Sequence, residues 1–114
     1  MQNFPEEIRA GELRSRGMIR RPMGNRDVHG GSNKTFEDVA TVSCGVETLQ
    51  GRELFDAQRR FSEVTARVTM RYPRSFTVAA NMQIVVGSST YDIRAVDDVN
   101  KRHKKLWLWC RELT

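Results

Sequence analysis

Residues 64–72, VTARVTMRY, carry the strongest structural pattern in the chain. Successive side chains of a strand point to opposite faces, so an alternating sequence separates a buried face from an exposed one. The face expected to be buried carries Val64, Ala66, Val68, Met70 and Tyr72. The opposite face carries Thr65, Arg67, Thr69 and Arg71. The alternation and the β-branched content predict a half-buried β-strand.

The same period of two recurs in four other segments, which lie at 13–19, 40–46, 82–96 and 106–110. Residues 82–96 read as two strands joined by a turn at 87–89, and with 106–110 they predict a meander of three strands. Gly17 interrupts the first segment and indicates a bulge or a close backbone approach. Cys44 falls on the apolar face of 40–46, which favours a buried thiol over a catalytic one.

Residues 106–110, LWLWC, place Leu106, Leu108 and Cys110 on one face and two tryptophans on the other. Trp107 and Trp109 therefore need cover, either from another element of the chain or from a second chain. A candidate cover is the amphipathic helix predicted over 51–63, which carries an apolar stripe and a permissive N-cap at Gly51.

Length and charge limit the class of protein. The chain has 114 residues, which corresponds to one domain, and a net charge of +5. Its pI near 9.8 raises the odds of a nucleic-acid or acidic partner, although basic residues on solvated strand faces and in a polar turn are the simpler interpretation. No apolar run has the length of a signal peptide or a membrane helix. We therefore expect synthesis in the cytoplasm, free thiols and no membrane contact.

A long connection at 22–37, rich in glycine, asparagine and charge, joins the first two predicted strands. A connection of this length without a pattern of its own is either functional or mobile. Four candidate functional residues lie here: Arg21, directly before the connection, and Arg26, His29 and Lys34 within it.

The sequence lacks the motifs of the common enzyme classes. Asp97 and Asp98 are adjacent and would point to opposite faces of a strand, which argues against a paired acid and base. Cys44 and Cys110 lack the clustered partners of a metal site. We predict no enzyme activity, no cofactor and no metal. A basic nucleic-acid-binding barrel remains an alternative, because Trp107 and Trp109 lie beside Arg111.

The order and spacing of these segments resemble the phage head-tail joining family, also called head closure, stopper or head-tail connector proteins. The resemblance runs from about Leu13 to Leu113. It rests on LRSRGMIRRP, on the stretch GNRDVHGGSNKTFEDVATVSCGVETLQGRELFDAQ, on VTARVTMRY, on YDIRAVDDV and on the hydrophobic last strand. It departs from the family pattern at three positions. His29 stands where an aromatic residue commonly precedes the loop glycine, Phe36 where a tryptophan is expected at the end of the loop, and Ser43 where an aromatic residue is expected.

The resemblance implies a mainly β fold, a small antiparallel β-barrel or sandwich with one short α-helix and a long loop between the first two strands. It implies one head-tail joining domain over 1–114, with an N-terminal extension at 1–12, a mobile loop at 22–37 and the helix at 51–63. The implied function is that of a structural virion protein of the bacteriophage neck, which takes part in viral assembly, closes the DNA-filled head and provides the surface to which the tail attaches.

The partners implied by the resemblance are further copies of the chain in a ring, commonly a dodecamer, the portal or adaptor protein, tail terminator and tail proteins, and genomic DNA held without sequence preference. Residues Arg21, Arg26, His29 and Lys34 are then candidates for facing the DNA channel. A ring built by head-to-tail contacts needs two complementary flanks, and the candidates for this subunit interface are Trp107, Trp109, Arg67 and Arg71. The alternatives are a basic nucleic-acid-binding module and another neck or tail ring protein, such as an adaptor or tail terminator.

Overall fold

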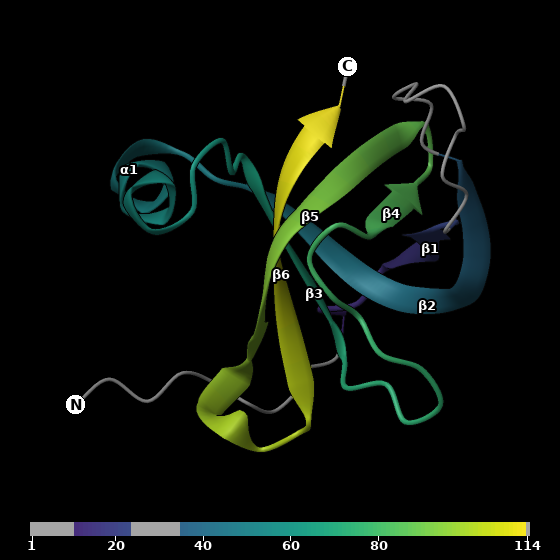
Figure 1. The fold of residues 1–114 in the computed structure, drawn as a ribbon. Coiled ribbons are helices and arrows are strands. Elements are labelled where there is room, and N and C mark those ends of the chain that lie inside the picture. Colours follow the sequence, from purple (N-terminus) through teal and green to yellow (C-terminus); the bar gives the residue numbers. More distant parts are fainter. Residues whose placement is uncertain (1–10, 24–34, 114) are drawn as a thin grey trace.

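The computed structural model describes residues 11–23 and 35–113 as a closed β-barrel with one α-helix beside it (Figure 1). The barrel is antiparallel throughout, with the strand order β1-β2-β3-β6-β5-β4. The strands are β1 (Ser15–Pro22), β2 (Phe36–Thr48), β3 (Ala66–Arg71), β4 (Gln83–Val86), β5 (Ser89–Asp98) and β6 (Lys105–Leu113). The helix is α1 (Gly51–Arg60), and a short 3₁₀ turn, η1 (Val99–Lys101), follows β5. The predicted fold class is confirmed.

The core lies inside the barrel and is formed by the apolar faces that the alternation predicts. Val68 and Leu108 are fully buried, and Ala66, Met70, Leu106 and Cys110 are at most 4% exposed. The predicted meander is confirmed, because β4 pairs with β5 and β5 pairs with β6. Tyr72 was wrongly placed on the buried face, since β3 ends at Arg71 and the Tyr72 side chain is 37% exposed.

The hairpin between β4 and β5 is tighter than the sequence indicates. Val86 pairs with Ser89, so the turn consists of Gly87 and Ser88. Gly87 has a φ of 61°, which a two-residue hairpin of the primed types requires and which glycine adopts without steric cost.

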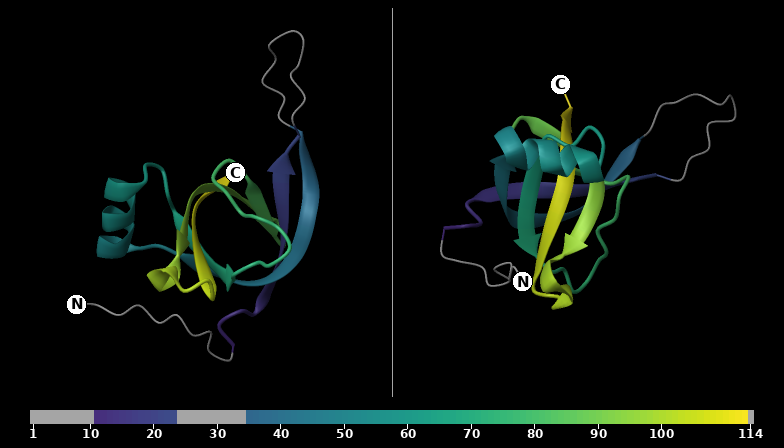
Figure 2. Two further views of the ribbon diagram at one scale, coloured as in Figure 1. Left: turned by 60° about the horizontal axis from the view of Figure 1, so that its bottom comes forward. Right: turned by 90° about the vertical axis from the view of Figure 1, so that its left-hand side faces the viewer.

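Helix α1 stands beside the barrel on the side of β3 and β6, while the β1–β2 pair lies on the other side (Figure 2). The helix ends at Arg60, three residues short of the predicted end at 63, and Phe61 continues in extended backbone. Its N-cap is Gln50, not the predicted Gly51, which occupies the first helical position with a φ of 58°.

Gly17 lies against two buried side chains, whereas the sequence indicates a bulge or a close approach of backbone. A Cβ atom at this position would lie 2.7 Å from Ile84 Cδ1 and 3.1 Å from Cys44 Sγ, and both of these side chains are fully buried. The register shift of β1 lies elsewhere, between Ile19 and Arg20. Gly17 thus keeps the barrel interior free for the side chains of β4 and β2.

Gly17→Ala is therefore expected to lower the free energy of unfolding by about 2 kcal/mol, because the added methyl group overpacks a closed core. Urea unfolding followed by tryptophan fluorescence measures the change. Ser43→Ala, on the exposed face of β2, is the matched control and should stay within about 0.5 kcal/mol of the unmodified protein. Equal stability of the two variants would contradict the close packing around Gly17.

Candidate functional site

The outer face of β3 and β6 carries the two tryptophans, and α1 covers one of them. Trp109 is 5% exposed and packs in a second hydrophobic cluster with Leu49, Ala57 and Val64. The Phe61 ring lies 6.0 Å from the Trp109 ring, between centroids. Helix α1 and the segments that flank it thus provide the cover that Trp109 requires within the same chain.

Trp107 lies further along the same face and is half-buried. Its ring meets that of Trp109 edge to face at 6.1 Å, and the Arg67 guanidinium lies over it at 4.5 Å from the centroid. A guanidinium over an indole face is attracted by the ring quadrupole. Trp107 is the tryptophan that keeps part of its surface accessible.

Arg67 connects three elements at this face. Its guanidinium pairs with Glu47 of β2 at 2.9 Å and with Glu53 of α1 at 3.0 Å, and it also lies 5.7 Å from the Trp109 ring. The Arg60 guanidinium approaches the same ring at 5.7 Å. Trp109 is thereby bounded by two cations, and its Nε1 has no hydrogen-bond partner among the described residues.

A buried ion pair closes the other end of this face. The Lys105 side chain is 1% exposed, and its Nζ lies 3.0 Å from Glu12 Oε1. A Cβ atom on Gly45 would lie 2.2 Å from the Glu12 carbonyl oxygen, so the glycine leaves room for the backbone at Glu12. Sequence reasoning missed this pair because Glu12 and Lys105 are separated by 93 positions.

Of the remaining predicted site residues, Arg71 lies at the Lys105 end of this face, Arg21 lies apart from it, and three lie outside the described residues. Arg21 is on β1, exposed, and paired with Glu37 of β2. Arg71 ends β3 and is exposed beside Lys105 in register. Arg26, His29 and Lys34 lie outside the described residues. The channel and interface roles of all these residues stay predictions.

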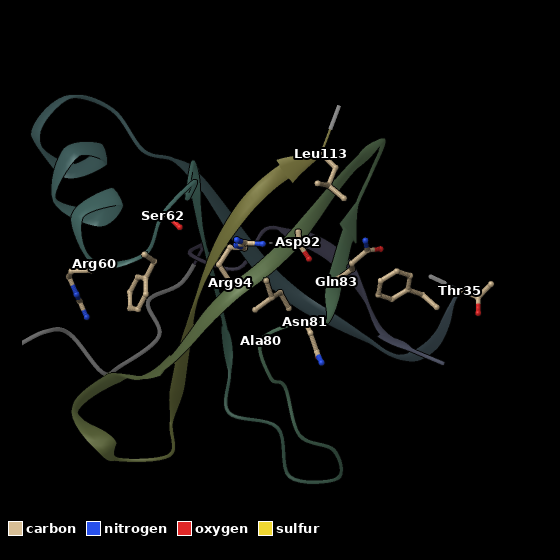
Figure 3. A pocket seen from close by; sticks show the side chains of 12 residues that line it. Thr35, Arg60, Ser62, Ala80, Asn81, Gln83, Asp92, Arg94 and Leu113 are labelled. Carbon is tan, nitrogen blue, oxygen red and sulfur yellow. Dashed lines mark hydrogen bonds and ion pairs between the residues drawn. The ribbon is translucent and has the colours of Figure 1, made fainter. Parts of the chain in front are cut away.

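An open groove of about 1110 Å³ runs over the outer side of β4 and β5. Its floor carries Gln83, Asp92 and Arg94, one bank carries Arg60 and Ser62, and Thr35 lies on the other side (Figure 3). Arg94 pairs with Asp92 at 3.2 Å and with Glu63 at 3.4 Å, and Glu63 also accepts from Arg111 at 2.9 Å. These charged side chains therefore form ion pairs with one another within the chain.

The two thiols lie inside the barrel and are both fully buried. Burial raises the pKa of Cys44, and burial together with the charges of Asp92 and Cys44 raises the pKa of Cys110 strongly. A thiol with a raised pKa is a poor nucleophile. Within residues 11–23 and 35–113, no group of three His, Cys, Asp or Glu side chains is placed to hold a metal ion. In the same ranges no helix has the length and apolar character needed to cross a membrane.

The geometry is that of a small closed barrel with an aromatic face that α1 covers in part and with exposed charge. The model of the phage head completion protein family matches residues 8–113, so the chain belongs to this family. The solution structure of protein SF1141 from Shigella flexneri 2a is similar, with 25% identity and a TM-score of 0.67 over 92% of this chain and 96% of that chain. No curated protein sequence matches the chain.

The family confirms the predicted resemblance and the bacteriophage, head-closure and β-barrel character of the protein. Phage head completion proteins are structural, and membership supports a role in the head-tail connector, as a virion component in contact with other head and tail proteins.

Proposed function

We propose that this protein assembles as a ring, commonly of twelve copies, beneath the portal or adaptor, closes the DNA-filled head and presents the surface to which the tail attaches. The observation that carries the proposal is the family match over 8–113. The barrel agrees with it, since a rigid closed sheet holds a fixed outer surface for contacts on two flanks. Complementation of a phage that lacks the gene is the assay, with particle assembly and genome retention as readouts.

The proposed subunit interface includes Trp107, Trp109, Arg67 and Arg71. The four contribute differently. Trp109 supports the interface from beneath α1, while Trp107 and Arg71 keep accessible surface. Arg67, with its side chain 17% exposed, holds Trp107 in place through the contact of its guanidinium with the ring.

Trp107→Ser is expected to reduce the yield of infectious particles at least about tenfold while the barrel stays folded, because large aromatics anchor protein interfaces. The measurement is plaque titre in complementation together with the melting temperature of the purified variant. Glu112→Ser, an exposed position on the same strand, is the control. A normal titre from Trp107→Ser would remove Trp107 from the interface.

We further propose that Arg21, Arg26, His29 and Lys34 face the DNA channel and contact phosphate without reading sequence. In a ring each charge is repeated around the channel, which strengthens the local field. Arg21 also forms an ion pair with Glu37, so its contribution to such a field is reduced.

Replacing Arg21, Arg26 and Lys34 together with serine is expected to lower genome retention severalfold while particles still assemble, since fewer cations would meet the DNA. The fraction of DNA-filled heads, counted by electron microscopy after complementation, measures this. Heads that retain DNA as well as those complemented by the unmodified protein would refute the channel role.

A nucleic-acid-binding barrel with the two tryptophans as a stacking platform is disfavoured. Such a platform needs open ring faces, whereas Trp109 is 5% exposed and Arg67 lies over Trp107.

A further inference from the structure

One end of the barrel concentrates positive charge, of which the proposed function uses Arg71 alone, as a candidate for the subunit interface. It is formed by the end of β3 with the residues that follow, and by the turn between β5 and β6 at the bottom of Figure 1. We call it the basic end; it comprises five exposed cations, Arg71, Arg74, Lys101, Arg102 and Lys104. The carboxylates on this stretch are Asp97 and Asp98, so the basic end is net positive.

Contacts between the two segments fix the basic end in one arrangement. The Tyr72 amide donates to the Lys104 carbonyl at 3.1 Å, and the Tyr72 and His103 rings meet at 4.7 Å between centroids. Asp98 accepts from the His103 amide at 3.0 Å, and its second oxygen lies 2.7 Å from His103 Nδ1. The cations of both segments therefore share one rigid base.

The backbone of the turn has positive φ at three positions. Asn100, Lys101 and His103 have φ values of 57°, 54° and 56°, in the left-handed region, where asparagine and histidine are enriched among non-glycine residues but lysine is not. Strained backbone of this kind gathers at functional sites, where surrounding contacts hold it. Lys101 is thus the charged residue that the turn keeps in a costly conformation, at a position where glycine would be free of strain.

The charges of the basic end differ from those on the barrel wall. Arg20 and Arg21 of β1 pair with Asp38 and Glu37, and Arg94 and Arg111 share Glu63. In contrast, Arg71, Arg74 and Lys101 make no ion pair with any residue in the described ranges. Their charge is available to a ligand.

We propose that the basic end binds the phosphate backbone of duplex DNA without reading its sequence. Cations from two segments on a rigid base suit a polyanion with regularly spaced charges, and such binding is driven by counterion release. The choice of DNA as the polyanion rests on the proposed function, which places the protein against packaged genome. This surface lies away from the end of β1 that leads to the 22–37 connection, so it adds a second DNA-binding surface to the channel candidates (Figures 1 and 2).

The test compares two purified variants, in each of which three cations are replaced. Arg71→Gln, Arg74→Gln and Lys101→Asn are combined at the basic end, with asparagine chosen because it tolerates the left-handed backbone. Arg16→Gln, Arg52→Gln and Arg59→Gln are combined as the control, because these arginines are exposed elsewhere and make no ion pair within the described ranges. Binding of a short fluorescent duplex of mixed sequence is measured by anisotropy between about 50 and 200 mM salt. Circular dichroism shows that both variants are folded.

We expect the basic-end variant to bind at least about tenfold more weakly than the control. The slope of log affinity against log salt concentration should become shallower by about 0.9 for each phosphate that the variant no longer neutralises. Equal affinity of the two variants would overturn the proposal, as would absence of duplex binding by the unmodified protein at low salt. Displacement of the duplex by an equal charge concentration of polyglutamate would also overturn it, in favour of an acidic protein partner. Because the assay uses the isolated protein, its failure would leave the phage complementation result, and with it the proposed function, untouched.

Discussion

Trp109→Ala is expected to lower the free energy of unfolding by about 4 kcal/mol, because it empties the centre of the cluster that joins α1 to the barrel. The side chain is 5% exposed and contacts the cluster of Leu49, Ala57 and Val64. The indole also lies near the guanidinium groups of Arg60 and Arg67. Truncation of the ring removes both the apolar packing and the attraction of these cations to its face.

Chemical denaturation with urea, followed by circular dichroism at the helix band, measures this destabilisation. Trp109→Phe is the matched control, since it keeps an aromatic ring and removes an Nε1 that has no hydrogen-bond partner among the described residues. We expect that variant to be destabilised by less than about 2 kcal/mol. Equal destabilisation by phenylalanine and alanine would show that ring packing is not what holds α1 on the barrel.

Glu12→Gln is expected to lower the free energy of unfolding by about 3 kcal/mol, because it leaves the Lys105 ammonium buried without its carboxylate. The Lys105 side chain is 1% exposed, whereas the Glu12 side chain is 28% exposed. Most of the desolvation free energy is therefore that of the lysine ammonium. The figure is at the low end for a buried pair because the carboxylate is partly solvated.

A second variant tests whether the destabilisation comes from the charge. Lys105→Met combined with Glu12→Gln removes both charges and keeps an apolar chain of similar length, so it should recover most of the stability. The difference between single and double variants in urea unfolding gives the coupling between the two positions. A Glu12→Gln protein as stable as the unmodified one would contradict the buried pair.

Alternation alone predicted the barrel core because the period of two is a direct consequence of strand geometry. Val68, Met70 and Leu108 follow that rule, and all are buried. The ends of the helix were less predictable from the sequence. Helix α1 ends at Arg60 instead of 63, since Phe61 turns to pack against Trp109 in extended backbone, a tertiary contact that no local pattern encodes.

The candidate site was predictable only in part. The alternation of LWLWC predicted two indoles that need cover, and α1, proposed as one possible cover, packs on Trp109. The Glu12–Lys105 pair and the meeting of Tyr72 with His103 join residues far apart in the chain, so they become visible only when β3, β6 and the N-terminal segment are placed together. Positive φ at Lys101 likewise has no sequence signal, because lysine does not favour the left-handed region.

Electron microscopy of a lysate from the encoding phage with this gene deleted tests the role in head closure and tail joining most directly, with plasmid complementation as the control. We expect separate heads that leak DNA and finished tails that remain unattached, and we expect the plasmid to restore joined particles. Intact infectious particles without the gene would contradict a role in closing the head and joining the tail.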